Sequence, residues 1–152
     1  MTVNAGRVRA LYDADASVVL RSSTSNITAT ATDTAVSLNE LDTAYWHDGN
    51  AIPYGDIEIA VNVASVDRTT GDETYVIEVI VDDTSDMSDT PSVVATLSVR
   101  AAGFYTLCVD SKNIPLLDPD TTGADKWMAI RATLSGNTPI LNYQAWMYKS
   151  GC

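Results

Sequence analysis

The sequence is poor in the groups on which most enzymes and metalloproteins depend. It contains one histidine, two cysteines and one phenylalanine in 152 residues. One histidine and two cysteines in dissimilar surroundings do not give the ligand spacing of a zinc site. Neither a nucleophile-elbow motif nor a glycine-rich phosphate-binding motif is present. We therefore predict no catalytic residue, no metal site and no cofactor, and we expect that the chain is not an enzyme.

Positive charge is also scarce, since nine Lys and Arg face twenty Asp and Glu and the net charge is −11. Affinity for nucleic acid comes largely from neutralising phosphates, so this balance disfavours nucleic acid and anionic membranes as partners. No apolar run approaches the length of a membrane span. The first residues lack the apolar core of a signal peptide, so we expect a protein made in the cytoplasm.

Long helical patterns are absent, and alternation of period two takes their place. In residues 57–63 the apolar side chains Ile57, Ile59, Val61 and Val63 share one face, which predicts a half-buried strand. Residues 74–81 alternate in the same way. A turn cluster at 67–72 separates these two segments, so we expect them to form a hairpin.

Further strands are predicted after the polar loop at residues 82–91. Residues 92–99, 126–134 and 140–148 alternate. Residues 104–109 form a continuous apolar run, which indicates a strand covered on both faces, with Cys108 as a small buried hydrophobe. A disulfide between Cys108 and Cys152 has no signal beyond the presence of both residues.

The first third of the chain is less regular. Residues 18–20 and 27–34 resemble β segments, and residues 38–46 fit a short helix or a bent loop equally well. We therefore predict one all-β domain: a jelly-roll-like antiparallel β-sandwich at residues 47–152, with an irregular N-terminal segment or arm at residues 1–46. A small β-barrel is the alternative architecture.

Two acidic stretches resemble cation sites only in composition. Asp82, Asp83, Asp86 and Asp89 share one loop. Residues 118–123 are similar to the start of a calcium loop, but its twelfth position is Ala129, where a glutamate is required. We interpret both as solvated loops, and His47, beside a turn, as a surface or packing residue.

Two tryptophans allow two interpretations. Trp127 and Trp146 lie opposite the main apolar rows of their strands, which fits either a second packed face or an exposed aromatic patch for a partner. A platform formed by both would favour a carbohydrate-binding or adhesin-like module. A glycosidase-type jelly roll is a third possibility, which requires two carboxylates in one cleft.

Several strand and turn segments together resemble the small cement, or decoration, proteins of tailed-bacteriophage capsids. The resemblance covers most of the chain from Ile57 onward and is patchy before it. It is carried by residues 11–16 (LYDADA), 55–59 (GDIEI), 71–75 (GDETY), 94–97 (VATL), 103–105 (GFY), 127–131 (WMAIR), 135–140 (SGNTPI) and 142–146 (NYQAW).

The resemblance implies a jelly roll that binds the outer surface of the phage head and stabilises the lattice of the major capsid protein. It also implies self-association, as a dimer or trimer, and location on the virion after assembly in the host cytoplasm. The alternative function is a non-catalytic carbohydrate-binding or adhesin-like β-sandwich. As candidate partner-binding residues we take Leu11, Tyr12, Val18, Leu20, Trp46, Trp127 and Trp146.

Overall fold

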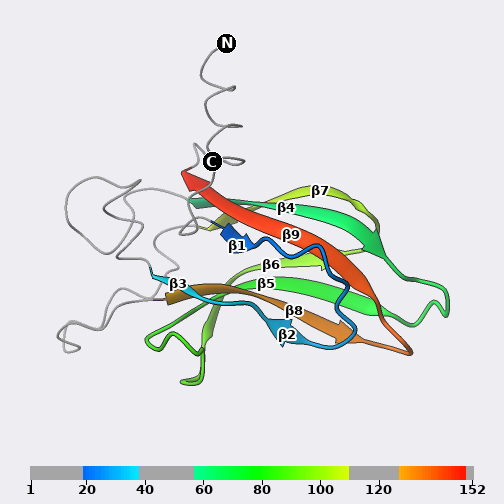
Figure 1. The fold of residues 1–152 in the computed structure, drawn as a ribbon, viewed down its shortest axis with the longest axis horizontal. Helices are drawn as coiled ribbons and strands as arrows, with labels where there is room; N and C mark the ends of the chain where they lie inside the picture. Colours follow the sequence, from blue (N-terminus) through cyan, green and yellow to red (C-terminus); the bar gives the residue numbers. More distant parts are fainter. Residues whose placement is uncertain (1–18, 38–56, 110–126, 150–152) are drawn as a thin grey trace, which may run out of the picture.

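The computed structural model describes residues 19–37, 57–109 and 127–149, which form two antiparallel sheets packed face to face (Figure 1). Sheet A has the order β1 (Val19–Arg21), β9 (Leu141–Lys149), β4 (Ile57–Val66) and β7 (Gly103–Val109). Sheet B has the order β2 (Ala31–Thr32), β8 (Trp127–Ser135), β5 (Thr74–Asp82) and β6 (Ser92–Val99), and β3 (Val36–Ser37) also pairs with β8. The predicted all-β sandwich is confirmed.

The strand pairing is nested, as in a jelly roll. β5 pairs with β6, β4 with β7, β2 and β3 with β8, and β1 with β9. Each successive pair encloses the previous one along the chain, and the members of successive pairs alternate between the two sheets. This is the arrangement of a double-sheet jelly roll, in which β2 and β3 together occupy one strand position.

The core lies between the sheets and is built by the predicted alternation. Complete burial of one such aliphatic side chain stabilises the fold by about 1.5–3 kcal/mol. The rows that meet in the core are Ile59, Val61 and Val63 of β4, Tyr75, Ile77 and Val79 of β5, Met128, Ile130, Ala132 and Leu134 of β8, and Leu141, Tyr143, Ala145 and Met147 of β9.

The predicted hairpin of residues 57–63 with 74–81 is wrong. β4 belongs to sheet A and β5 to sheet B, so the segment between them crosses from one sheet to the other. Asp67 organises this crossing, because its carboxylate accepts a hydrogen bond from the Thr69 amide (2.9 Å) and its carbonyl accepts one from the Tyr75 hydroxyl. Tyr75 in turn accepts a bond from the Ile140 amide at 3.1 Å, which joins the crossing to the β8–β9 turn.

The prediction that residues 104–109 are covered on both faces is also wrong. Only one face of β7 is buried, by Leu107 and Val109, whereas Phe104 is 59% exposed. Cys108 is exposed rather than buried, and it takes part in a disulfide. The other cysteine of the sequence, Cys152, lies outside the described residues.

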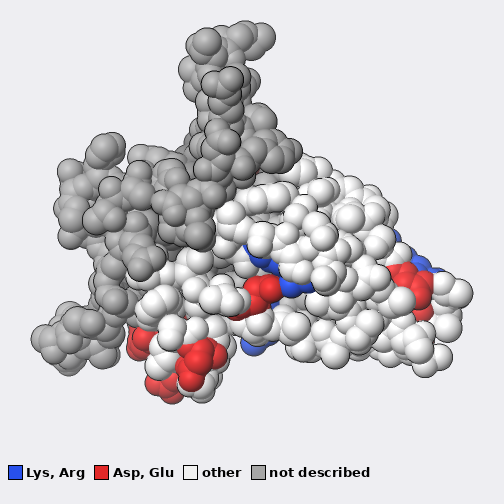
Figure 2. Space-filling model, in the orientation of Figure 1, with Lys and Arg blue, Asp and Glu red and all other residues white. Residues whose placement is uncertain are grey.

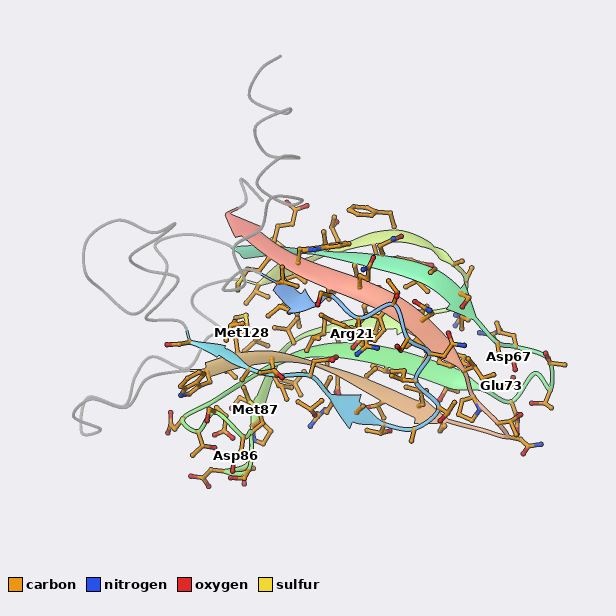
Figure 3. All side chains as sticks on the ribbon, in the orientation of Figure 1. Arg21, Asp67, Glu73, Asp86, Met87 and Met128 are labelled. Atoms are coloured by element: carbon orange, nitrogen blue, oxygen red, sulfur yellow. The ribbon has the colours of Figure 1, made fainter. Side chains whose placement is uncertain are left out.

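A buried ion pair fastens the N-terminal segment to the sandwich. Arg21, only 7% exposed, lies between the two sheets (Figure 3) and donates to Asp33 Oδ1 at 2.6 Å, to the Tyr143 carbonyl at 3.0 Å and to the Ser25 carbonyl at 3.1 Å. Its guanidinium also lies 5.0 Å from the centre of the Tyr143 ring. Burial, and secondarily the Asp33 carboxylate, raise the pKa of Tyr143. The arrangement links β1 of sheet A to the strands of sheet B.

Candidate binding surface

Charge is distributed unevenly over the described part of the molecule. Two loops hold most of its acidic side chains: the crossing at 67–73, with Asp67, Asp72 and Glu73, and the loop at 82–91, with Asp82, Asp83, Asp86 and Asp89. Figure 2 shows acidic atoms at opposite ends of the sandwich, and between them a cluster of acidic and basic atoms in an otherwise uncharged body.

The charged groups on the described strands are few, and most are paired with one another. Arg131 donates to Glu78 at 2.8 Å on sheet B, and Arg21 pairs with Asp33. Glu58 is the acidic residue of β4. Interfaces between proteins are depleted in charge at their centres, so the body of the sandwich has the composition of a contact surface and the loops do not.

The acidic loops use their carboxylates to hold their own backbone. Asp82 accepts bonds from the amides of Asp83 (2.7 Å) and Asp89 (3.0 Å). The Ser88 hydroxyl donates to Asp86 at 2.7 Å, and this bond, together with the Thr84 hydroxyl, lowers the pKa of Asp86. Within the described ranges no three His, Cys, Asp or Glu side chains form a group that could hold a metal ion. The second acidic stretch, residues 118–123, and His47 lie outside these ranges.

Glu73 has the corresponding role at the other end of the sandwich (Figure 3). Its side chain is 2% exposed and accepts bonds from the Thr70 hydroxyl, the Thr70 amide (3.0 Å) and the Gly71 amide (2.9 Å). The Thr70 hydroxyl is the largest cause that lowers the pKa of Glu73. A carboxylate that accepts hydrogen bonds from its own loop stabilises the conformation of the turn. We therefore assign Glu73 a structural role.

On the outer face of sheet A, the described side chains are uncharged apart from Glu58 of β4. Its members are the residues that alternate with the core rows, and their register places them in two neighbouring rows. Gln144, Asn62 and Phe104 lie side by side across β9, β4 and β7, and the next row contains Val19, Trp146, Ala60 and Thr106. We call these seven residues the sheet A face. Phe104, at its β7 edge, is the most exposed large apolar side chain of residues 19–37, 57–109 and 127–149.

One amide side chain of this face has a structural role. Gln144 Nε2 donates to the Ser22 carbonyl at 2.9 Å, and the adjacent Asn142 donates to the Thr24 carbonyl at 2.6 Å. These bonds hold residues 22–26 beside β9, which extends the face beyond β1. Since both amides are engaged by this segment, the face offers mainly its aromatic and small side chains to a partner.

The residues predicted from the sequence to bind a partner do not lie together in the structure. Trp146 lies on the sheet A face, but Trp127 is on β8 and points to the outer side of sheet B, opposite the core residue Met128. The two tryptophans therefore cannot form one platform. Leu20 is 2% exposed and belongs to the core, so its side chain is not presented to a partner. Leu11, Tyr12, Val18 and Trp46 lie outside the described residues.

Phe104 was not among the predicted residues. The run from Phe104 to Val109 contains apolar side chains on both faces of the strand, and it was interpreted as doubly covered. The sequence did contain a contrary signal, because Thr106 and Cys108 share a face with Phe104 and are exposed with it. A single polar position in the run marks the uncovered face.

Within the described residues no helix has the length and hydropathy that a membrane crossing requires.

Comparison with known proteins does not assign this chain to a family. No protein-family model and no curated protein matches the sequence. A solved structure of the CBM22-1–GH10 modules of Clostridium thermocellum endo-1,4-β-D-xylanase 10B, complexed with xylohexaose, aligns with 84% of this chain and 26% of that chain. The identity is 14% and the TM-score 0.35, so the likeness contributes no argument about function.

Proposed function

We propose that this chain is a non-catalytic decoration protein that binds the major capsid protein on the outer surface of a phage head through the sheet A face. The observation that carries the proposal is Phe104, 59% exposed at the edge of a sheet face on which Glu58 is the charged side chain among the described residues, in a chain of net charge −11. The segments that resemble tailed-phage cement proteins support the same function.

The physical case is that this role requires complementary surfaces and no chemistry. Aromatic side chains that become buried at the centre of an interface contribute a large share of binding energy, while surrounding small and polar residues exclude water. The sheet A face offers this arrangement, with Phe104 and Trp146 beside the polar Asn62 and Thr106, whereas Ala60 is fully buried. A protein that binds the assembled lattice and not its free subunits stabilises the lattice by mass action.

The proposal is tested with heads of the virus that encodes this chain, assembled without it. We expect the added protein to co-sediment with the heads, and Phe104→Ala to weaken binding at least about tenfold, as for a truncated interface anchor of at least about 1.4 kcal/mol. Phe104→Leu, which retains most of the apolar area, should bind nearly as well as the natural protein. Thr32→Ala, an exposed change on β2 of sheet B, is the control for unrelated surface effects.

Two results would contradict this function. One is the absence of the polypeptide from purified virions. The other is binding of Phe104→Ala at the natural affinity, which would show that the lattice contact lies elsewhere on the molecule.

A second function, binding of a polysaccharide, is favoured by one observation. Trp146 lies on the same sheet face as the amide of Asn62, and stacking on an aromatic ring together with hydrogen bonding by an amide is a common combination in small-molecule recognition. A glycan array followed by calorimetry distinguishes the two functions. Sugar binding should require Trp146 and Asn62, and it should tolerate Phe104→Ala better than lattice binding does.

A further inference from the structure

We propose that two copies of this chain pair through β6, edge to edge and antiparallel, to continue sheet B across a two-fold axis. This inference does not depend on the capsid function. It rests on the free edge that β6 forms in the described structure, on the composition of that strand and on the charges at its two ends.

β6 is the last strand of sheet B, and within the described part of the chain it pairs only with β5. The outer edge of such a strand presents a row of backbone N–H and C=O groups that can pair with another strand. Proteins that remain monomeric commonly protect a free edge with lysines, with proline, with a very short strand or with a β-bulge. β6 has a bulge at Val94, but its residues 95–99 keep a regular register with β5. β6 has eight residues, Ser92-Val93-Val94-Ala95-Thr96-Leu97-Ser98-Val99, with neither a charge nor a proline among them.

A bulge in β6 increases the apolar surface at this edge. The register between β5 and β6 shifts between the pairs Val79–Ala95 and Ile80–Val93, so Val94 is an extra residue on β6. The shift changes the phase of the alternation. Val93, which the sequence pattern places in the same row as Ala95, Leu97 and Val99, is therefore 45% exposed, while Val94 packs against the core.

The occupant of this edge is a second copy because the charges around β6 complement each other only in the antiparallel self-pair. The strand begins after the acidic loop that contains Asp86 and Asp89, and Arg100, which is exposed, follows its last residue. A two-fold axis near Ala95 and Thr96 places each Arg100 beside the acidic loop of the other copy. Two chains of charge −11 repel each other over most of their surfaces, so an uncharged strand with opposite charges at its ends is the place where contact costs least.

The closed geometry of such a pair also fits the strand. Antiparallel pairing of identical strands is isologous, so the β6 edges of both copies are occupied by each other. No third copy can then add at β6. The outer edges of sheet B are then β2 and β3, which are short. β-strand addition of this kind draws affinity from backbone hydrogen bonds and specificity from the flanking side chains.

The solution mass of the full chain tests the proposal, by sedimentation equilibrium from 1 to 200 µM. We expect a species of twice the 16.3 kDa chain mass in this range. Thr96→Glu places two carboxylates near the axis and should raise the dimer dissociation constant at least about tenfold. Thr32→Glu, the same change at an exposed position on β2 at the opposite edge of sheet B, is the matched control and should leave the dimer intact. Circular dichroism establishes that both variants are folded.

Exchange of the flanking charges gives a second, independent readout. Arg100→Asp should weaken the dimer, and Asp89→Arg in the same chain should restore it, because the two positions meet across the axis. Hydrogen exchange should show protection of the residue 92–99 amides that increases with protein concentration. A monomer throughout the range, a dimer unaffected by Thr96→Glu, or a dimer disrupted instead by Thr32→Glu would overturn the proposal.

Discussion

Among the glycines of the described residues, Gly136 is the position where one added methyl group should most disturb the fold. Its φ is +98°, in the region that side-chain-bearing residues rarely adopt, and a Cβ atom there would lie 2.7 Å from both the Asp72 carbonyl oxygen and the Glu73 Cα. Both neighbours are backbone, so neither can move without displacing the crossing between β4 and β5. Two bonds between the turns depend on this approach, from the Thr70 hydroxyl to the Asn137 carbonyl and from the Asn137 amide to Asp72, each at 3.3 Å.

The magnitude follows from two additive costs. The positive φ costs an alanine about 1–2 kcal/mol, and the forced separation of two packed turns adds about 1–3 kcal/mol. We therefore expect Gly136→Ala to lower the free energy of unfolding by about 3 kcal/mol. For a domain of this size that lowers the melting temperature by about 6–12 °C.

Gly71→Ala is the matched control. Gly71 has a similar φ of +82°, but a Cβ there meets no atom within 4 Å. The control should therefore show the conformational cost alone, about 1–2 kcal/mol. Urea unfolding followed by tryptophan fluorescence measures both variants. If Gly136→Ala were no more destabilising than Gly71→Ala, the inferred contact between the two turns would be refuted.

Three further predictions concern the charged and phenolic groups. Arg21→Ala removes a side chain only 7% exposed, its ion pair with Asp33 and its bonds to the Tyr143 and Ser25 carbonyls, and should cost about 3–5 kcal/mol in urea unfolding. Arg131→Ala, at an arginine 27% exposed, should cost about 1 kcal/mol or less; equal losses would contradict the role given to Arg21. The pKa of Glu73 is lowered in the folded state, so its contribution to stability is present above its unfolded pKa and lost as the pH falls, and Glu73→Gln should flatten the decline between pH 5 and 3. The pKa of Tyr143 is raised, so the folded state is favoured below the ordinary tyrosine pKa near ~10 and loses stability above it. Tyr143→Phe should reduce the loss of unfolding free energy between pH 9 and 11. If the stability of Glu73→Gln or of Tyr143→Phe varied with pH in parallel with that of the natural protein, the pKa shift inferred for that residue would be contradicted.

The sequence predicts the strands of the second half well because alternation is a local signal. β8 and β9 have the predicted core rows, and β6 has the predicted bounds. Pairing is less accessible, since the turn chemistry at residues 67–73 is the same whether the chain returns within a sheet or crosses to the other. The bulge at Val94 leaves no mark in the sequence, so the exposed side of Val93 could not be predicted.

The candidate binding surface was only partly predictable, because strand pairing cannot be read from local sequence patterns. Trp127 and Trp146 occupy equivalent phases in consecutive strands, but β8 and β9 belong to different sheets, which places them on opposite sides of the molecule. The contact between Arg21 and Tyr143 joins residues 122 positions apart, and no local pattern indicates it. Position along a strand can be inferred from sequence, whereas the neighbour across a sheet depends on the topology.

The nested order of the strands has a consequence for synthesis of the chain. β1, near the beginning of the sequence, finds its hydrogen-bond partner in β9, near the end, and β4 is flanked on one side by that same strand. On the ribosome, β1 and one edge of β4 therefore remain unpaired until almost the whole polypeptide has emerged. Native pairing of this kind is slow because segments distant in the sequence must first meet. Chain entropy is lost at that step, before the stabilising contacts form. Nascent chains stalled before residue 141 should consequently be protease-sensitive and prone to recruit chaperones.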